Sequence, residues 1–443
     1  MSKFQFQRIF AVCLVLTVLL SGWPTSLQAQ TPPPGADPAP DELFICEAEL
    51  PSVARIYFDD VAVLAELGWL DIWEVRPEAG FLVAQILPHQ AAQLEALGLR
   101  VEVDAELTLQ ITQIRKPLEG QVTGIPGYPC YRTVEETFAM AEQIVADYPA
   151  LAEWIDIGDS WERTQNPTNG YDLMVLRLTN EAIPGPKPVL FIMTATHARE
   201  YTPPELAARF AEHLIANYGV DPDVTWILDY HEIHLLLMTN PDGRKQAEAG
   251  YSWRKNTNAN YCPGGGYPPQ GHGADLNRNF DYQWGCCGGS SGVQCDQTYR
   301  GPSAASEPET QAVQDYINTI FPDLRPDDDY TPAPDTTSGI FMDIHSYSRL
   351  VLWAWGYTSN PSPNHTAMQT LGRRFAYFNT YKPQRSAYLY TTDGTTDDYA
   401  YGELGVPAYT FELGDDFFEP CANFEATIYP DNLEALLYAA KVV

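Results

Sequence analysis

Basic residues are scarce in this chain of 443 residues. It has 26 Lys and Arg against 58 Asp and Glu, which gives a formal net charge of −32. A surface this acidic repels phosphate groups, so nucleic acids and anionic membranes are poor partners. Disorder is excluded too, because 45% of the residues are hydrophobic and 12% are aromatic, enough to bury a large core. The composition suits a folded protein that meets neutral or cationic ligands.

Hydrophobic runs of spanning length are lacking as well. Lys3 and Arg8 precede a short apolar run over residues 9–20, and Leu27-Gln28-Ala29 resembles a small-residue cleavage site. A membrane anchor is the alternative, but it needs about 20 apolar residues, more than this run contains. The pattern predicts a cleaved signal peptide over residues 1–29 and a secreted, extracellular product.

Cysteine is infrequent, and Cys13 falls within the predicted signal peptide. Seven cysteines remain after the signal peptide, and an odd number is unfavourable in an oxidising compartment. Six remain if Cys46 lies in a segment that is later removed. Two of the seven, Cys286 and Cys287, are adjacent, and adjacent cysteines seldom pair with each other. The seven that follow the signal are Cys46, Cys130, Cys262, Cys286, Cys287, Cys295 and Cys421.

The first part of the mature chain predicts a small separate domain. A Pro-rich linker over residues 30–41 precedes it, and a second linker, 111–128, contains Arg115-Lys116 and several Gly and Pro. Between them, residues 42–110 alternate in the order β-α-β-β-α-β, which predicts an α+β ferredoxin-like fold. The strands are expected at 55–57, 71–75, 81–86 and 99–103, and the helices at 59–67 and 89–97.

Residues 129–443 predict a larger α/β domain. Thr133-x-x-Glu136 is a capping box at a helix start, and the apolar run 189–194 is typical of a buried parallel strand. The alternation predicts a mixed, mostly parallel twisted sheet with helices on both faces. Its ligands should bind beyond the carboxyl ends of the strands. The other strands are expected at 233–239, 340–344 and 409–413, and the helices at 204–217, 306–320, 366–378 and 431–441.

Polar side chains follow three of these predicted strands. His197-Ala-Arg-Glu200 follows 189–194, His345 follows 340–344, and Glu412 lies at the end of 409–413. Two histidines and one carboxylate make a catalytic zinc site with one position left for water. Glu412 could act as the general base on that water. The H-x-x-E spacing alone fits a capped helix start equally well, and the placement of His345 strengthens the metal interpretation.

A second pair of histidines, His231 and His234, looks metal-like by spacing. The pair enters an apolar strand, where residues three apart point to opposite faces. We therefore expect neither to bind metal.

Six motifs resemble those of the zinc metallocarboxypeptidase family. They occur in the family's order between about residues 130 and 440, and the likeness is strongest to secreted bacterial enzymes similar to carboxypeptidase T. The resemblance implies that residues 42–110 are an inhibitory prosegment of a zymogen. The motifs are His197-Ala-Arg-Glu200, Asn240-Pro-Asp-Gly243, Asp275-Leu-Asn-Arg-Asn279, Thr298-Tyr-Arg-Gly301, His345-Ser-Tyr347 and Thr410-Phe-Glu-Leu413.

The resemblance also implies a role for each matching residue. One zinc ion per chain would be bound by His197, Glu200 and His345. Glu412 would be the general base and Arg254 would stabilise the oxyanion. The remaining matches are Tyr390 as a mobile lid, Asn277 and Arg278 as the clamp on the substrate's terminal carboxylate, Arg199 as a secondary carboxylate contact, and Asp275 as the partner that orients the first histidine.

Two further features concern selectivity and structure. Asp397 matches the base of the family's specificity pocket, where an acid goes with C-terminal Lys or Arg. If Arg385 reached Asp397, the charge of the pocket would be cancelled and C-terminal apolar residues would become acceptable. A separate alternative is that Asp397 is a solvated loop acid with no role in the pocket. Asp327-Asp328-Asp329 fits a solvated acidic loop better than a structural calcium site. Cys262 and Cys295 match a disulfide-bonded pair of animal family members.

The sequence thus predicts a secreted, monomeric zinc metallocarboxypeptidase acting on peptides and proteins with a free C-terminal carboxylate. One alternative is a zinc amidase on peptidoglycan stem peptides, whose substrate also ends in a carboxylate. The other is a catalytically dead peptide-binding protein on the same fold. Glu412 argues against the second alternative, because a dead protein does not need the base.

Overall fold

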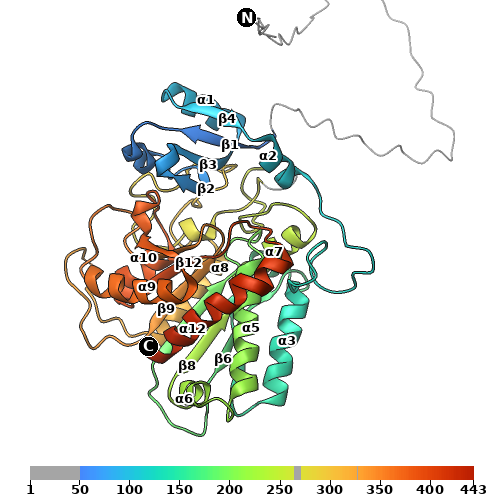
Figure 1. The fold of residues 1–443 in the computed structure, drawn as a ribbon, viewed down its shortest axis with the longest axis vertical. Coiled ribbons are helices and arrows are strands. Elements are labelled where there is room, and N and C mark those ends of the chain that lie inside the picture. Colours follow the sequence, from blue (N-terminus) through green and yellow to red (C-terminus); the bar gives the residue numbers. More distant parts are fainter. Residues whose placement is uncertain (1–49, 264–270, 327) are drawn as a thin grey trace, which may run out of the picture. The chain divides into compact units, whose positions relative to one another are not determined.

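The computed structural model describes residues 50–263, 271–326 and 328–443. The predicted signal peptide, the linker 30–41 and Cys46 lie outside these residues. Within the described ranges, no helix is both long and apolar enough to cross a membrane. The described chain forms a four-stranded and an eight-stranded sheet (Figure 1).

The first sheet belongs to residues 50–112, which we call the N-terminal block. Its strands lie in the order β2-β3-β1-β4, and every pairing is antiparallel. The predicted β-α-β-β-α-β order is present. The elements are β1 (Ser52–Tyr57), the 3₁₀ helix η2 (Val61–Glu66), β2 (Asp71–Arg76), β3 (Phe81–Ile86), α1 (Pro88–Ala96) and β4 (Arg100–Val103).

Alternation along these strands divides their side chains between two cores. Ala54 and Ile56 of β1 lie in the small core of the block, together with Leu94 of α1. Val53 of β1 and Trp73 of β2 belong to the large core of the following domain. Successive side chains on a strand point to opposite faces, so the sheet is apolar on both.

A helix that the sequence did not predict ends the block. α2 (Ala105–Thr112) begins after Asp104, whose side chain accepts hydrogen bonds from the amides of Glu106 and Leu107. Such a cap satisfies amides at a helix start that have no partner within the helix. The helix extends two residues beyond the predicted end of the block at residue 110, and the boundary between block and linker stays a prediction.

The second sheet has the order β11-β10-β12-β9-β7-β8-β6-β5. Four neighbouring pairs are parallel and three are antiparallel, which confirms a mixed, mostly parallel sheet. Its strands are β5 (Ala152–Asp159), β6 (Asp172–Leu178), β7 (Val189–Thr194), β8 (Glu232–Leu236), β9 (Ile340–His345), β10 (Leu350–Trp353), β11 (Lys382–Arg385) and β12 (Ala408–Glu412).

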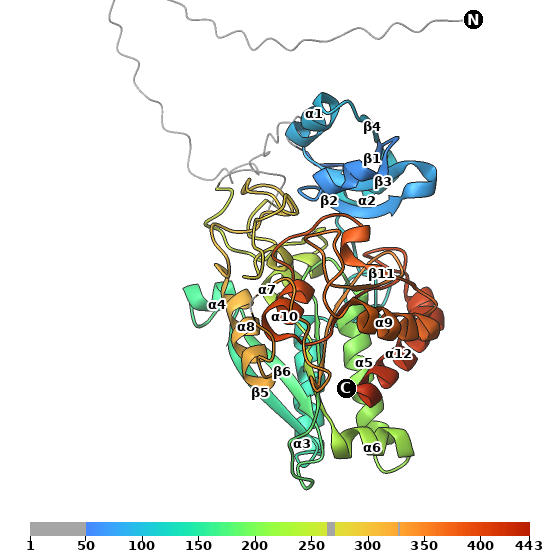
Figure 2. The same ribbon diagram turned by 90° about the vertical axis from the view of Figure 1, so that its left-hand side faces the viewer.

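Helices cover both faces of this sheet, as predicted. Figure 2 shows α8 and α10 on one side and α5, α9 and α12 on the other. The longer helices are α3 (Val134–Asp147), α5 (Thr202–Asn217), α6 (Pro222–Tyr230), α7 (Pro241–Glu248), α8 (Pro308–Ile320), α9 (His365–Asn379), α10 (Thr396–Leu404) and α12 (Tyr429–Val442).

Two predicted helix starts have different outcomes. Thr133 and Glu136 form the expected capping box at α3. The motif Ser306-x-x-Glu309 does not cap α8, which begins at Pro308 after Glu307. Glu309 instead accepts a hydrogen bond from the amide of Trp161, at the start of α4 (Trp161–Gln165). The side chain is used for a contact between two helices.

Three disulfides join the six cysteines of the described residues. Cys130 pairs with Cys421, and the expected pair of Cys262 and Cys295 is present. Cys286 pairs with its neighbour Cys287, although adjacent cysteines were expected to pair only rarely.

Candidate active site

The three central strands β12, β9 and β7 are neighbours and parallel to one another. Every residue of β7 and of β9 is buried, which explains the continuous apolar run of β7 and the apolar residues Ile340, Phe341, Met342 and Ile344 of β9. His197 follows the carboxyl end of β7, His345 is the last residue of β9, and Glu412 pairs with His345 at the end of β12. The topology thus gathers the predicted polar residues at one edge of the sheet.

His197, Glu200 and His345 converge on one point. The Nδ1 atom of His197 lies 2.7 Å from Glu200 Oε1 and 3.1 Å from His345 Nδ1, which is itself 3.0 Å from Glu200 Oε2. Among the described residues, this is the single group of three or more His, Cys, Asp or Glu that could hold a metal ion. Facing imidazole nitrogens beside a carboxylate oxygen suit a cation, and this donor set fits zinc.

A carboxylate holds the far side of each imidazole. Asp275 Oδ1 lies 3.0 Å from His197 Nε2, and Asp343 Oδ2 lies 2.8 Å from His345 Nε2. Carboxylate partners of this kind orient metal-binding histidines and increase their basicity. Burial alone would lower the pKa of His345, but the charges of Asp343 and Glu200 raise it well above its ordinary value. The site therefore favours positive charge.

Asp343 was missed in the sequence because it lies inside a buried apolar strand. A signal was nevertheless present. Asp343 precedes His345 by two residues, and side chains two apart on a strand share a face. A lone acid on the same face as a candidate ligand, in an otherwise apolar strand, indicates a partner for that ligand.

Two arginines approach the site from different segments. Arg254 donates from Nε and Nη2 to Asp275 Oδ2, at 3.0 and 2.8 Å. Arg278 donates from Nε to the carbonyl of Gly289 and from Nη1 to the carbonyl of Asn277. Asn277 also accepts a hydrogen bond from the Thr396 amide. The short 3₁₀ helix η4 (Leu276–Arg278) carries the Asn–Arg pair.

One cavity brings most of the predicted residues together. Ile72 and Trp73 of the N-terminal block line the same cavity, whereas Arg199 and Asp275 lie outside its lining. The predicted residues that line it are His197, Glu200, Arg254, Asn277, Arg278, His345, Tyr390, Asp397 and Glu412.

Glu412 and Tyr390 both line this cavity, and Tyr390 also contacts the N-terminal block. Burial raises the pKa of Glu412 to about 8, against the opposing charges of His345 and Arg254. Burial likewise raises the pKa of Tyr390, whose side chain packs against the small core of the N-terminal block. Tyr390 is therefore in contact with the block as well as with the cavity.

Asp397 is a buried carboxylate at the start of α10. It accepts hydrogen bonds from the hydroxyls of Ser386 and Thr395, each at 2.8 Å, and from the Asp398 amide. Arg385 points elsewhere, because its guanidinium donates to the carbonyl of Ser359 and to the hydroxyl of Tyr388. The partners of Asp397 are thus neutral, and it is not a solvated loop acid.

The competing histidines have other partners. His231 lies just past the end of α6, with Nδ1 3.2 Å from the carbonyl of Ile227. His234 lies in β8 between the hydroxyl of Tyr316 and the carboxylate of Glu232. In the acidic run 327–329, Asp328 accepts hydrogen bonds from the amides of Tyr330 and Thr331 in its own turn, and Asp329 accepts one from the hydroxyl of Tyr282. Asp327 lies outside the described residues, so the choice between the predicted acidic loop and the alternative calcium site stays untested.

A sequence profile described as zinc carboxypeptidase matches residues 137–435. The chain is 32% identical to a zinc carboxypeptidase of Saccharothrix mutabilis subsp. capreolus, over 74% of this chain and 73% of that protein. It is 29% identical to carboxypeptidase A1 of Rattus norvegicus, over 78% and 80%. The fold resembles carboxypeptidase A from Helicoverpa armigera, with a TM-score of 0.67 at 21% identity, over 89% of this chain and 98% of that one.

The fold and site define a metal-dependent exopeptidase. The chain belongs to the zinc carboxypeptidase family, and its activity is that of a zinc-dependent metallocarboxypeptidase.

Proposed function

We propose that this protein is a secreted zymogen whose mature form removes C-terminal residues, with acceptance of Lys and Arg. The observation that carries the proposal is the shared cavity. The zinc-binding triad, Glu412 and the pair Asn277 and Arg278 all line it. A site that holds a terminal carboxylate beside a hydrolytic centre acts on the last peptide bond. Secretion agrees with the three disulfides, which form in oxidising compartments, and we expect a monomer.

Substrate binding begins at the terminal carboxylate. A guanidinium offers a planar fork of donors that matches a carboxylate, and Arg278 has its Nε and Nη1 held by the carbonyls of Gly289 and Asn277. This anchoring fixes the direction of the side chain before substrate arrives. A substrate held by Arg278 and Asn277 has its last peptide bond beside the triad and Glu412.

Hydrolysis needs a base and a donor for the developing oxyanion. Glu412 accepts a proton from the attacking water and then delivers it to the leaving amine. Arg254 donates to the carbonyl oxygen as negative charge develops on it, where stabilisation accelerates the reaction. A zinc ion held by His197, Glu200 and His345 supplies Lewis-acid polarisation and lowers the pKa of water. Asp275 keeps both Arg254 and His197 in place.

The N-terminal block acts as an inhibitory prosegment in this proposal. Asp71 of β2 receives two hydrogen bonds from Arg199 Nη2, at 2.7 and 2.9 Å, and lies 3.4 Å from Arg254 Nη1. Its carboxylate therefore occupies the donors that a substrate would use. Burial would raise the pKa of Asp71, but Arg199 and Arg254 lower it, so the carboxylate stays charged. Ile72 and Trp73 fill part of the cavity.

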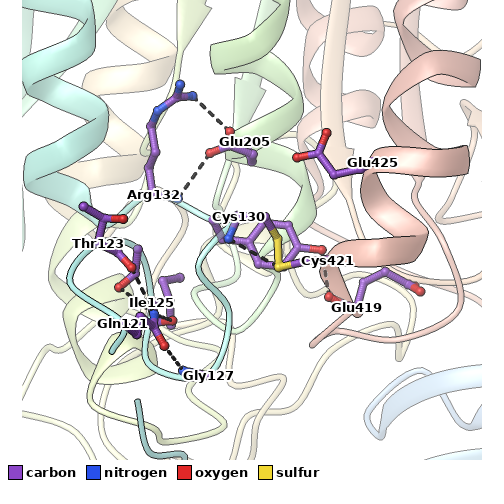
Figure 3. Close-up of a disulfide and its surroundings, with 12 residues drawn as sticks. Gln121, Thr123, Ile125, Gly127, Cys130, Arg132, Glu205, Glu419, Cys421 and Glu425 are labelled. Carbon is purple, nitrogen blue, oxygen red and sulfur yellow. Dashed lines mark hydrogen bonds and ion pairs between the residues drawn. A yellow bond between two sulfur atoms is a disulfide. The ribbon is translucent and has the colours of Figure 1, made fainter. Parts of the chain in front are cut away.

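Activation requires a cut between the block and the catalytic domain, between Arg115 and Tyr131. Arg115 packs over the ring of Phe418 and donates to Gln110, so it is a poor protease target. Val122 is 92% exposed, and we place the cut in the stretch 116–123. Downstream, Cys130 is bonded to Cys421 (Figure 3). The new N-terminus would remain attached to the enzyme.

The preferred terminal residue follows from Asp397. Its carboxylate lines the cavity and is bound by two hydroxyls and one amide, with no cation among these partners. A substrate cation would supply the missing charge. A charge-assisted contact of this kind contributes about 1.5–3 kcal/mol, so C-terminal Lys and Arg should be accepted alongside apolar residues.

The test is an assay of the activated protein on peptides ending in Arg, Phe or Glu and on muropeptides, with and without a chelator. We expect release of C-terminal Arg and Phe that is abolished by the chelator and restored by zinc. Cleavage of muropeptides alone would favour the amidase. Binding of peptides without turnover would favour the catalytically dead protein.

A further inference from the structure

The disulfide between Cys286 and Cys287 lies in a loop that touches both sides of the substrate site. We call residues 285–291 the vicinal-disulfide loop. On one side, the carbonyl of Gly289 accepts the 3.0 Å hydrogen bond from Arg278 Nε. On the other, the amides of Cys287 and Gly289 donate to Asp393 Oδ2 at 3.2 and 2.9 Å. One loop thus contacts the proposed carboxylate clamp and a buried acid.

Asp393 is fully buried and belongs to the segment that carries Tyr390 and Asp397. Its Oδ1 accepts a hydrogen bond from the hydroxyl of Ser290, so three donors of the vicinal-disulfide loop converge on one carboxylate. A buried carboxylate must have its charge satisfied, and here this loop supplies the donors. The position of the segment 390–397 therefore depends on the loop.

The vicinal-disulfide loop and the segment 390–397 are packed too closely for either backbone to shift alone. A Cβ atom on Gly289 would lie 2.3 Å from the carbonyl carbon of Thr392, so backbone packs directly on backbone. Two residues after Thr392, the carbonyl of Gly394 accepts a hydrogen bond from the Phe280 amide, and the Thr396 amide donates to Asn277. A shift of the vicinal-disulfide loop would be passed to the pocket wall and to the clamp together.

The disulfide itself adds stiffness rather than buried area. Cys286 and Cys287 are both exposed, whereas Gly289 and Asp393 are buried. A bond between adjacent side chains closes a small ring through their peptide bond, which restricts the backbone torsions of this dipeptide. The restricted dipeptide contains the Cys287 amide that binds Asp393. When the groups around a site are already held in place, fewer side chains and loops must be ordered as the substrate binds, and binding is tighter.

We propose that the Cys286–Cys287 disulfide and Asp393 are positioning groups for substrate recognition, which hold Arg278 and the wall of the Asp397 pocket in place. The inference rests on the proposed function, since it assigns Arg278 and Asp397 to the substrate. Neither positioning group touches the reacting atoms. Their loss should therefore weaken substrate binding and leave the hydrolytic step nearly unchanged.

The kinetic test uses the full chain, activated by limited proteolysis, with Cys286→Ser and Cys287→Ser combined. We expect KM for peptides ending in Arg or Phe to rise about tenfold, because substrate binding must then order side chains that the loop no longer holds. The value of kcat should change less than about threefold, and zinc content should not change. The matched control is Cys130→Ser with Cys421→Ser, a disulfide whose cysteines do not line the cavity. It should lower thermal stability and leave KM unchanged.

A second variant and a second measurement make the test independent of folding and turnover. Asp393→Asn places an amide N–H against the loop amides, and should raise KM as the cysteine variant does. Hydrogen exchange of peptides covering 281–300 and 390–397 should become faster in the cysteine variant, with β7 and β9 unchanged. An unchanged KM together with unchanged exchange would overturn the inference. A wild-type protein that cleaves no peptide would reject the proposed function, while the exchange result would still decide whether the loop holds the segment.

Discussion

Glu412 lies opposite His345 at the ends of two parallel strands, close enough to the triad for its protonation state to matter. Glu412 lines the same cavity as the three proposed metal ligands but is not itself one of them. Substituting the base alone can therefore test its role without dismantling the metal site.

Glu412→Gln keeps the shape of the side chain and removes the proton acceptor. We expect peptide hydrolysis to fall by at least about a hundredfold, the lower range of general-base catalysis, with zinc content unchanged by elemental analysis. Glu434→Gln, an exposed position on α12, is the control and should keep full activity. Turnover close to wild type would reject Glu412 as the base.

Asp397→Ala removes the carboxylate from the pocket and should change selectivity. The ratio of kcat/KM for peptides ending in Arg and in Phe should fall roughly tenfold or more, the value of a charge-assisted contact. Asp335→Ala removes an exposed acid elsewhere and should leave the ratio as it is. If Asp397→Ala also leaves the Arg-to-Phe ratio of kcat/KM unchanged, another residue selects the terminal side chain.

At the scale of elements, β9 supplies both the proposed metal ligand His345 and the carboxylate of Asp343 behind it. Asp343→Asn should weaken zinc binding by about 10- to 100-fold, as loss of such partners does. Competition with a chromogenic chelator measures the change. His345→Ala should lose the zinc, and His234→Ala, with its partners Tyr316 and Glu232, should keep it. Normal zinc affinity in Asp343→Asn would mean that β9 contributes only His345.

The start of α8 provides a prediction about pH. Burial and the charge of Glu307 raise the pKa of Glu309 from 4.5 to about 8. Between these values the folded protein holds a proton that the unfolded chain has released, so stability falls as pH rises through this window. The slope is at most about 1.4 kcal/mol per pH unit.

Glu309→Gln cannot release this proton. Its urea unfolding midpoint should therefore decline less between pH 5 and pH 8 than that of the wild type. Glu434→Gln should keep the wild-type slope. Equal slopes in all three proteins would show that Glu309 is ionised in the folded state.

The predictable elements were those with a simple pattern. The run 189–194 is apolar up to its final Thr and is followed within three residues by His197. The run 340–344 is apolar except for Asp343 and is followed directly by His345, so the strands and the candidate metal ligands could be recognised. α10 was missed because eight of its nine residues are buried, which leaves no apolar stripe on one side. The strands β10 and β11, of four residues each, are too short to show a period.

Long-range contacts were beyond the sequence for another reason. Asp71 binds Arg199, 128 residues away along the chain, and nothing near Asp71 indicates that partner. The Cys286–Cys287 bond depends on backbone torsions that composition does not reveal. The resemblance to a known family supplied the roles of Arg254 and Tyr390, which spacing alone did not.

At the scale of the whole molecule, the uncut chain should be latent because Asp71 occupies two arginines. Asp71→Asn leaves Arg199 without its buried charged partner, a change that costs about 3–5 kcal/mol. The uncut variant should hydrolyse a small peptide at least tenfold faster than the uncut wild type. Asp59→Asn, at an exposed position of the same block, is the control. Equal latency in both variants would mean that Asp71 does not contribute to inhibition.

The same contact should be insensitive to mild acid. Because the pKa of Asp71 is lowered from 3.8, its carboxylate stabilises the bound block at every pH above that value. The stabilisation is lost only as pH falls through the lowered pKa. Latency of the uncut wild type should therefore be constant from pH 8 to pH 5. Activity that appears near pH 6 would indicate a different titrating group.

The Cys130–Cys421 bond joins residues 291 positions apart, so an enzyme cut upstream of Cys130 is a covalent ring with two short tails. Unravelling from the new N-terminus would stop at the first sulfur atom. A fully unfolded ring has fewer conformations than an open chain, and this favours the folded state more for longer loops. The mature enzyme would thus carry a permanent restraint on its denatured chain after removal of the N-terminal block, the proposed prosegment. For an enzyme released among other proteases, resistance to opening determines its working lifetime.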